Sequence, residues 1–239
     1  MFSVFGEYDY PFRLETGPIR IEIAEEEGFF TYHRSSDHGE VHKIISGKGG
    51  KIVISPVEPV NLPEEVTKYL EIRFTPIAIE PDSVQEFYLK FPIETGIFLK
   101  GKGEGGILDI VGLTRPKYSL YGTPDDGIIT RYYESPLYDR IPACEALREG
   151  VLSLTVRNSS RGWMEVSRVV IDCSSLSLYY NDMVTMAGQM EIFSREIADV
   201  RIDDRPLMKD MRPANLLSKA RKTIIPDKIP FTMEYGAGE

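Results

Sequence analysis

The three histidines of this chain all lie in one short segment, TYHRSSDHGEVHKI. If the residues flanking the loop Ser35–Glu40 pair as two strands, a symmetric register places His33 opposite His42. Directly opposed Cβ atoms lie about 4.5–5.5 Å apart, so the two imidazoles could share one ion. His38 or Asp37 could add a third ligand from the loop. Imidazoles suit a divalent transition metal, and the predicted ligands are His33, His38 and His42.

The commoner explanation is a surface hairpin whose imidazoles are ordinary polar neighbours. The spacing H-x4-H-x3-H matches no closed zinc motif, and the H-x-H pair of cupin-type barrels is missing. On this interpretation no cofactor is expected. The histidine segment therefore supports two hypotheses, a metal site and a plain polar hairpin.

A second cluster combines tyrosine with arginine in the segment Lys117–Tyr138, which contains five tyrosines. Tyrosine supplies flat apolar area with a polar tip, and arginine can stack on it or bind a carboxylate. Such a cluster suits a partner protein, a peptide or a sugar. The alternative is structural, with the rings straddling the seam between two sheets. The predicted binding residues are Tyr118, Tyr121, Arg131, Tyr132 and Tyr133.

Other motifs carry less chemistry. The glycine-rich stretches GKGG and GKGEGG lack the Ser or Thr and the following helix of a phosphate loop. TPDDG lacks the further oxygen ligands of a calcium loop, and it is typical of a turn. No G-x-S-x-G nucleophile elbow is present. We therefore assign no catalytic residue from the sequence.

Alternating apolar and polar residues recur along most of the chain, as in Ile19–Ile23, Leu70–Phe74 and Leu152–Val156. This period predicts strands with one buried and one exposed face, and glycine-containing turns separate them. The predicted fold is all-β, an antiparallel β-sandwich. We expect a sandwich half over 1–112, a second over 113–205, and a basic helical tail over 206–239. Short helices are predicted over Pro142–Glu149 and Pro213–Lys222.

The overall composition limits the partners and the compartment. The net charge of −9 disfavours nucleic acid, because binding it requires a basic face. No apolar stretch approaches the length of a transmembrane helix, and the N-terminus lacks the features of a signal peptide. The two cysteines have no CxxC spacing, which favours reduced thiols. We expect a cytoplasmic protein, and homo-oligomerisation is left open.

Three segments carry a resemblance to a known family: Pro56–Thr67, Lys117–Tyr138 and Leu154–Asp172. The most distinctive part is K-Y-x-L-Y-G-x-P, followed by a Gly-Ile-Ile-x-Arg-Tyr strand. Here the chain resembles an uncharacterised archaeal family that is known only as a domain of unknown function. The resemblance covers nearly the whole chain and implies an archaeal, cytoplasmic protein. It implies no activity, cofactor or catalytic residue.

The favoured function at this point is a non-catalytic binding or scaffolding protein that recognises a partner through the Tyr118–Tyr138 region. In that hypothesis Arg131 anchors an acidic or carbonyl group, and the tyrosines supply contact area. The alternatives are a metal-dependent enzyme that uses His33, His42 and His38, and a carbohydrate-binding module.

Overall fold

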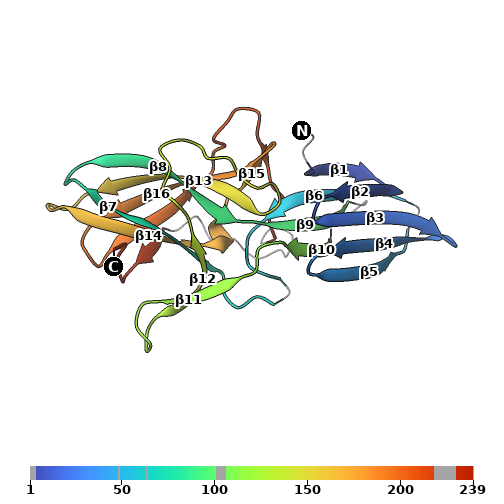
Figure 1. The fold of residues 1–239 in the computed structure, drawn as a ribbon, viewed down its shortest axis with the longest axis horizontal. Helices are drawn as coiled ribbons and strands as arrows, with labels where there is room; N and C mark the ends of the chain where they lie inside the picture. Colours follow the sequence, from blue (N-terminus) through green and yellow to red (C-terminus); the bar gives the residue numbers. More distant parts are fainter. Residues whose placement is uncertain (1–3, 48, 63, 101–105, 218–229, 239) are drawn as a thin grey trace.

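The computed structural model describes residues 4–47, 49–62, 64–100, 106–217 and 230–238. Within these ranges the chain is almost entirely β-structure, which confirms the predicted all-β fold. The strands form two sandwiches that lie side by side (Figure 1). We call them the first and the second sandwich.

The first sandwich consists of two four-stranded antiparallel sheets. One sheet has the order β2 (Phe12–Thr16), β3 (Ile19–Glu26), β4 (Phe29–Ser36) and β5 (Gly39–Ile45). The other has the order β1 (Gly6–Asp9), β6 (Lys51–Val57), β9 (Glu94–Lys100) and β10 (Ile107–Gly112). The alternating residues Ile19, Ile21 and Ile23 are 1–2% exposed and pack in the core between these sheets.

The second sandwich also has two sheets. One has the order β11 (Lys117–Tyr121), β12 (Ile128–Glu134), β7 (Tyr69–Ile79) and β14 (Met164–Asp172). The other runs β18 (Arg212–Pro213), β15 (Tyr179–Tyr180), β16 (Val184–Ile192), β13 (Glu149–Asn158) and β8 (Val84–Pro92). Two further strands, β17 (Ala198–Asp203) and β19 (Phe231–Met233), extend that sheet from β16. A 3-10 turn, η1 (Cys173–Ser175), follows β14.

Among the described strands, two pairs are parallel rather than antiparallel, namely β12 with β7 and β13 with β16. Strand β13 is buried along most of its length, on both faces, and its sequence EGVLSLTVRN places Leu152, Leu154 and Val156 on one side. Burial on both faces is typical of parallel pairing. Alternation alone does not reveal strand direction, so the prediction of a purely antiparallel sheet was wrong at these two pairs.

The two sandwiches are not formed by the residues before and after Gly112, respectively. Strands β7 and β8 precede that residue, yet they pair within the second sandwich. The chain then returns to the first sandwich for β9 and β10 before it enters β11. Each sandwich keeps its own main apolar core, and Phe5 packs against both cores.

The first predicted helix is absent from the structure, and the second lies partly outside the described residues. Over Pro142–Glu149 the structure has an irregular segment and a turn, with Leu147 at φ 70°, a value incompatible with a right-handed helix. That prediction was wrong. The predicted helical tail over 206–239 is not seen in its described residues, where β18 and β19 are strands and Pro213 lies in β18. Residues 218–222 of the second predicted helix lie outside the described residues.

Both cysteines are free thiols, as the spacing predicts, with Cys173 buried and Cys144 half-buried. Burial raises the pKa of the Cys144 thiol to about 11, which keeps it protonated at neutral pH. Within the described ranges, none of the helical segments has the length and apolar character needed to cross a bilayer.

Candidate functional site

The open face of the first sandwich carries the histidines, and strand alternation puts them there. Ile21 and Tyr32 are each 1% exposed and point into the core. Their neighbours Glu22 and His33 therefore point outward from β3 and β4. The pairing of β4 with β5 sets His33 directly opposite His42, as the symmetric register predicts. Cross-strand pairing also sets Glu22 opposite His33, which gives a polar row across three strands.

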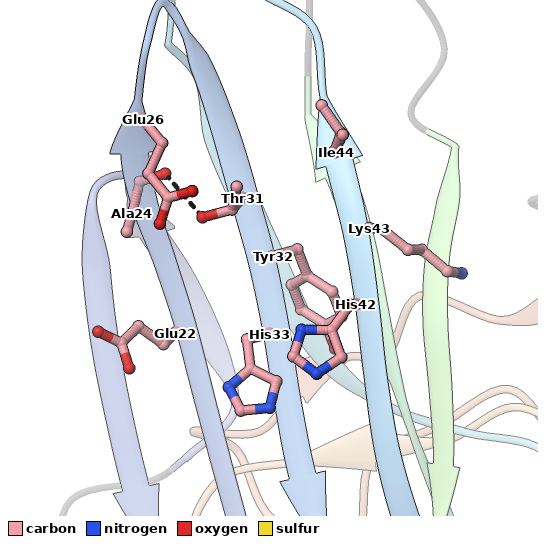
Figure 2. A pocket seen from close by; sticks show the side chains of 9 residues that line it. All are labelled: Glu22, Ala24, Glu26, Thr31, Tyr32, His33, His42, Lys43 and Ile44. Atoms are coloured by element: carbon pink, nitrogen blue, oxygen red, sulfur yellow. Dashed lines mark hydrogen bonds between the residues drawn. The ribbon is translucent and has the colours of Figure 1, made fainter.

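The two imidazoles lie side by side (Figure 2). Their ring centroids are 4.1 Å apart, and the ring planes meet at 14°. The His33 side chain is 32% exposed and that of His42 is 68% exposed, so His42 has the greater freedom to rotate. The pair lines a depression of about 760 Å³ on the sheet face, together with Glu22, Ala24, Glu26, Thr31 and Ile44.

Glu40 completes a group of three metal-ligand side chains. Its Oε2 lies 3.6 Å from Nε2 of His42 and 3.9 Å from Nε2 of His33. One ligand atom from each residue lies within 4.8 Å of the others. Nε2 of His33 is buried and has no hydrogen-bond partner. In the described ranges, no second group of three His, Cys, Asp or Glu side chains gathers this closely.

His38 is not part of this group. It lies in the turn after β4, and its Nε2 is 3.5 Å from the carbonyl oxygen of Leu113. It lines a different depression, which it shares with Arg34 and Arg115. The structure therefore brings together His33 and His42 but not His38, because the turn points the third imidazole toward Leu113, in the connection between β10 and β11.

A buried polar cluster holds β4 against β10 directly beneath the histidines. Oδ2 of Asp109 accepts a hydrogen bond from the Tyr32 hydroxyl at 2.8 Å and from Nε of Arg34 at 2.9 Å. Asp109 and Arg34 side chains are both 8% exposed. Burial and the neighbouring Asp109 raise the pKa of Tyr32, so its hydroxyl remains a donor. These bonds flank His33 on both sides along β4 and fix where its backbone lies.

Two imidazoles and a carboxylate are a familiar ligand set for zinc and for the other late first-row metals. Bound ligand atoms lie about 2.0–2.2 Å from such an ion. The stacked rings here present their lone pairs side by side, so binding requires the ring planes to tilt toward each other. His42 and Glu40 are 68% and 61% exposed, and both side chains can make that adjustment.

The predicted anchor of the tyrosine cluster, Arg131, is buried. It is 3% exposed and forms an ion pair with Glu94, which is 1% exposed. It also donates to the carbonyl oxygens of Pro59 at 2.8 Å and Thr114 at 3.4 Å. In this arrangement its guanidinium is occupied by groups of the chain itself.

The tyrosines divide between the interior and the surface. Tyr121 is 1% exposed, and its hydroxyl donates to the carbonyl oxygen of Gly236 at 3.0 Å. Burial raises its pKa to about 12. Tyr133 is half-buried and donates to Glu149 at 2.8 Å. Tyr132 donates to Glu134 on the surface, and Tyr118 is 40% exposed. Of the five predicted binding residues, Tyr118 is thus exposed, and Tyr132, like Tyr133, is half-buried.

Sequence reasoning missed two features of these sites. It considered His38 and Asp37 as the third ligand, although Glu40 lies two residues before His42 and shares its face of β5. It also looked for tyrosine and arginine in the hairpin and passed over Leu120 and Ile129, which are 42% and 50% exposed. Strand alternation would have found Glu40, but it does not reveal the exposure of Leu120 and Ile129, because Arg131 on the same face of the hairpin is buried.

Comparison with known proteins gives one result. Residues 4–234 match the model of a family described as a protein of unknown function, DUF432. Neither the curated proteins nor the solved structures provide a match. The match spans nearly the whole chain, both sandwiches included, and the chain belongs to the DUF432 family of proteins of unknown function.

Proposed function

We propose that this chain is a metal-binding protein that takes up one divalent transition-metal ion at His33, His42 and Glu40. The observation that carries the proposal is the convergence of two imidazole nitrogens and one carboxylate oxygen within 4.8 Å on one sheet face. The second support is the buried Nε2 of His33, which lacks a hydrogen-bond partner. Buried polar atoms usually have one, so a ligand that satisfies it is expected to bind favourably.

The proposed site keeps open coordination positions. Three protein ligands on an exposed face leave room for water or for a small ligand, which is the arrangement of an accessible ion rather than a closed structural one. Because imidazole must lose its proton to bind a metal, affinity is expected to fall as the solution becomes acidic.

Isothermal titration with Zn²⁺ tests this function, and the third histidine provides a matched control. We expect one ion per chain, and a loss of affinity of at least about 100-fold in His42→Ala, since removing groups that merely support a ligand already costs about 10–100-fold. His38→Ala should bind as the unchanged chain does, because its imidazole lies at Leu113. Absence of Zn²⁺ binding, or equal losses in the two variants, would contradict the proposal.

A second candidate function, recognition of a protein through the β11–β12 hairpin, is supported by the exposed side chains there. Tyr118, Leu120 and Ile129 are each at least 40% exposed on this hairpin. We expect Leu120→Lys to reduce capture of native partners in a pull-down. Val84→Lys, at an apolar residue 47% exposed on another strand, is the matched control. Equal capture by the two variants would count against this candidate.

A further inference from the structure

Strand β11 forms an outer edge of its sheet. It is the terminal strand in the order β11-β12-β7-β14, and the hairpin stands out from the body of the molecule (Figure 1). Its register with β12 runs without a bulge from Lys117 opposite Tyr132 to Tyr121 opposite Ile128. Its other side has no strand partner within the described ranges. An edge of this kind exposes backbone donors and acceptors that can pair with another strand.

This edge is short and begins at Lys117, but it has no bulge and no charge in mid-strand, two features that protect natural sheet edges. Tyr118 and Leu120 lie two residues apart on one face and are 40% and 42% exposed. Ile129, directly opposite Leu120, is 50% exposed. The hydroxyl of Thr67 donates to the carbonyl oxygen of Ile129 at 2.6 Å, which brings Val66, 53% exposed, to the same area.

Charges of opposite sign lie at the two ends of this strand. Arg115 and Lys117 are exposed at its beginning, and Asp125 and Asp126 are exposed in the turn that follows its end. None of these four side chains forms an ion pair within the described residues. When two copies of such a strand pair antiparallel, the basic end of each comes to lie beside the acidic turn of the other.

We propose that the chain forms a twofold homodimer by antiparallel pairing of β11 with β11 of a second copy, centred on Ser119. This register sets Tyr118 opposite Leu120 of the second copy, twice, and it brings Arg115 to the turn that carries Asp125. It joins two four-stranded sheets into one continuous sheet across the dimer. Identical patches related by a twofold axis are the commonest way in which soluble chains associate.

The inference deepens the second candidate function and rests on it, since it names the partner of the hairpin. A five-residue edge with one apolar face buries less than the roughly 1,200 Å² at which stable interfaces begin. The dimer is therefore expected to be weak, with a dissociation constant in the micromolar range, and to weaken further in salt, which screens exposed charges.

Sedimentation velocity of the purified full-length chain tests the dimer directly. Over roughly 1–500 µM at low salt, the sedimentation coefficient should rise from the monomer to the dimer value, in line with the affinity expected for so small an interface. Leu120→Lys should remain monomeric, and Val84→Lys should dimerise as the unchanged chain does. A chain that stays monomeric throughout overturns the inference. If it still captures partners through Leu120, the hairpin recognises another protein and the second candidate stands.

A charge exchange tests the antiparallel orientation. Arg115→Glu and Asp125→Arg, each made alone, should weaken the dimer at low salt because each places like charges side by side. The double variant carries both exchanged charges and should recover the original association. Failure of the double variant to recover, while both single variants remain folded by circular dichroism, would overturn the orientation.

Cysteine pairing tests the register, in a background in which Cys144 is replaced by serine. Opposed residues of an antiparallel pair have Cα atoms about 4.5–5.5 Å apart, which suits a disulfide. Tyr118→Cys mixed with Leu120→Cys should therefore cross-link faster than either variant does alone. Equal rates in the three samples would overturn the pairing centred on Ser119.

Discussion

At the scale of single residues, the ionisation of Glu149 is coupled to the fold. Its carboxylate accepts hydrogen bonds from Lys90 at 2.9 Å and from Tyr133 at 2.8 Å. Burial opposes its ionisation, but these bonds outweigh burial and lower the pKa of Glu149 below its ordinary value of 4.5. The folded state thus favours the ionised carboxylate.

This shift fixes the sign of one pH effect. A lowered pKa contributes stability that is complete above about pH 4.5 and is lost as the pH falls through the folded value. We expect Glu149→Gln to reduce the free energy of unfolding by about 1.5 kcal/mol at pH 7, the typical contribution of a hydrogen bond to a charged group. The difference from the unchanged chain should shrink toward pH 3.5. Urea unfolding at both pH values measures it, and a difference independent of pH would refute this assignment.

The sequence predicts two of the three residues of the histidine site, His33 and His42, but not Glu40. The register of His33 with His42 follows from a hairpin that closes symmetrically, and it is confirmed. The third ligand does not follow from proximity in the sequence. His38 turns toward Leu113, whereas Glu40 shares a face with His42 because the two are separated by two residues along a strand.

At the scale of elements, strand β4 depends on the carboxylate of Asp109, which lies on β10. Asp109→Ala would leave the guanidinium of Arg34 buried without its counter-charge, and we expect a loss of about 3–5 kcal/mol in unfolding free energy. Tyr32→Phe removes one hydrogen bond to the same carboxylate and should cost about 1.5–3 kcal/mol. Chemical denaturation gives both values. A cost for Asp109→Ala that is no larger than that for Tyr32→Phe would contradict the anchoring role.

Alternation predicts which residues face the core, but it says little about strand direction. Leu152, Leu154 and Val156 are all fully buried, as their spacing predicts. Whether β13 runs parallel or antiparallel to β16 depends on the path of the connection between them, and the residue pattern is the same in either case. The prediction of a helix after Pro142 was wrong because so short a helix has little intrinsic stability, and tertiary contacts then decide the path of the segment.

At the scale of the whole molecule, Glu94 and Arg131 connect the two sandwiches. Glu94 belongs to β9 of the first sandwich, and Arg131 belongs to β12 of the second. Their side chains are 1% and 3% exposed, and Glu94 also accepts the backbone N–H of Asn61 at 3.0 Å. Because this buried ion pair joins the two sandwiches, the position of one sandwich depends on that of the other. The tyrosines around Arg131 suggested that its side chain lies on a binding surface. The fold shows instead that the Arg131 side chain is buried.

Removing one member of this pair should be costly. We expect Arg131→Met to lower the free energy of unfolding by about 3–5 kcal/mol, because it leaves the Glu94 carboxylate buried without its partner. Arg13→Met is the matched control, since the Arg13–Glu15 pair is more than half exposed and should contribute only about 0–1 kcal/mol. Thermal and chemical denaturation measure both. Similar small losses in the two variants would show that Arg131 does not hold the sandwiches together.

The most direct test of the proposed function is a crystal structure grown with Zn²⁺, with data collected at the zinc absorption edge. The proposal predicts an anomalous peak about 2.0–2.2 Å from Nε2 of His33, Nε2 of His42 and a carboxylate oxygen of Glu40, with the two rings tilted out of their stack. Crystals in which zinc binds elsewhere, while these two rings remain stacked and free of metal, would contradict it.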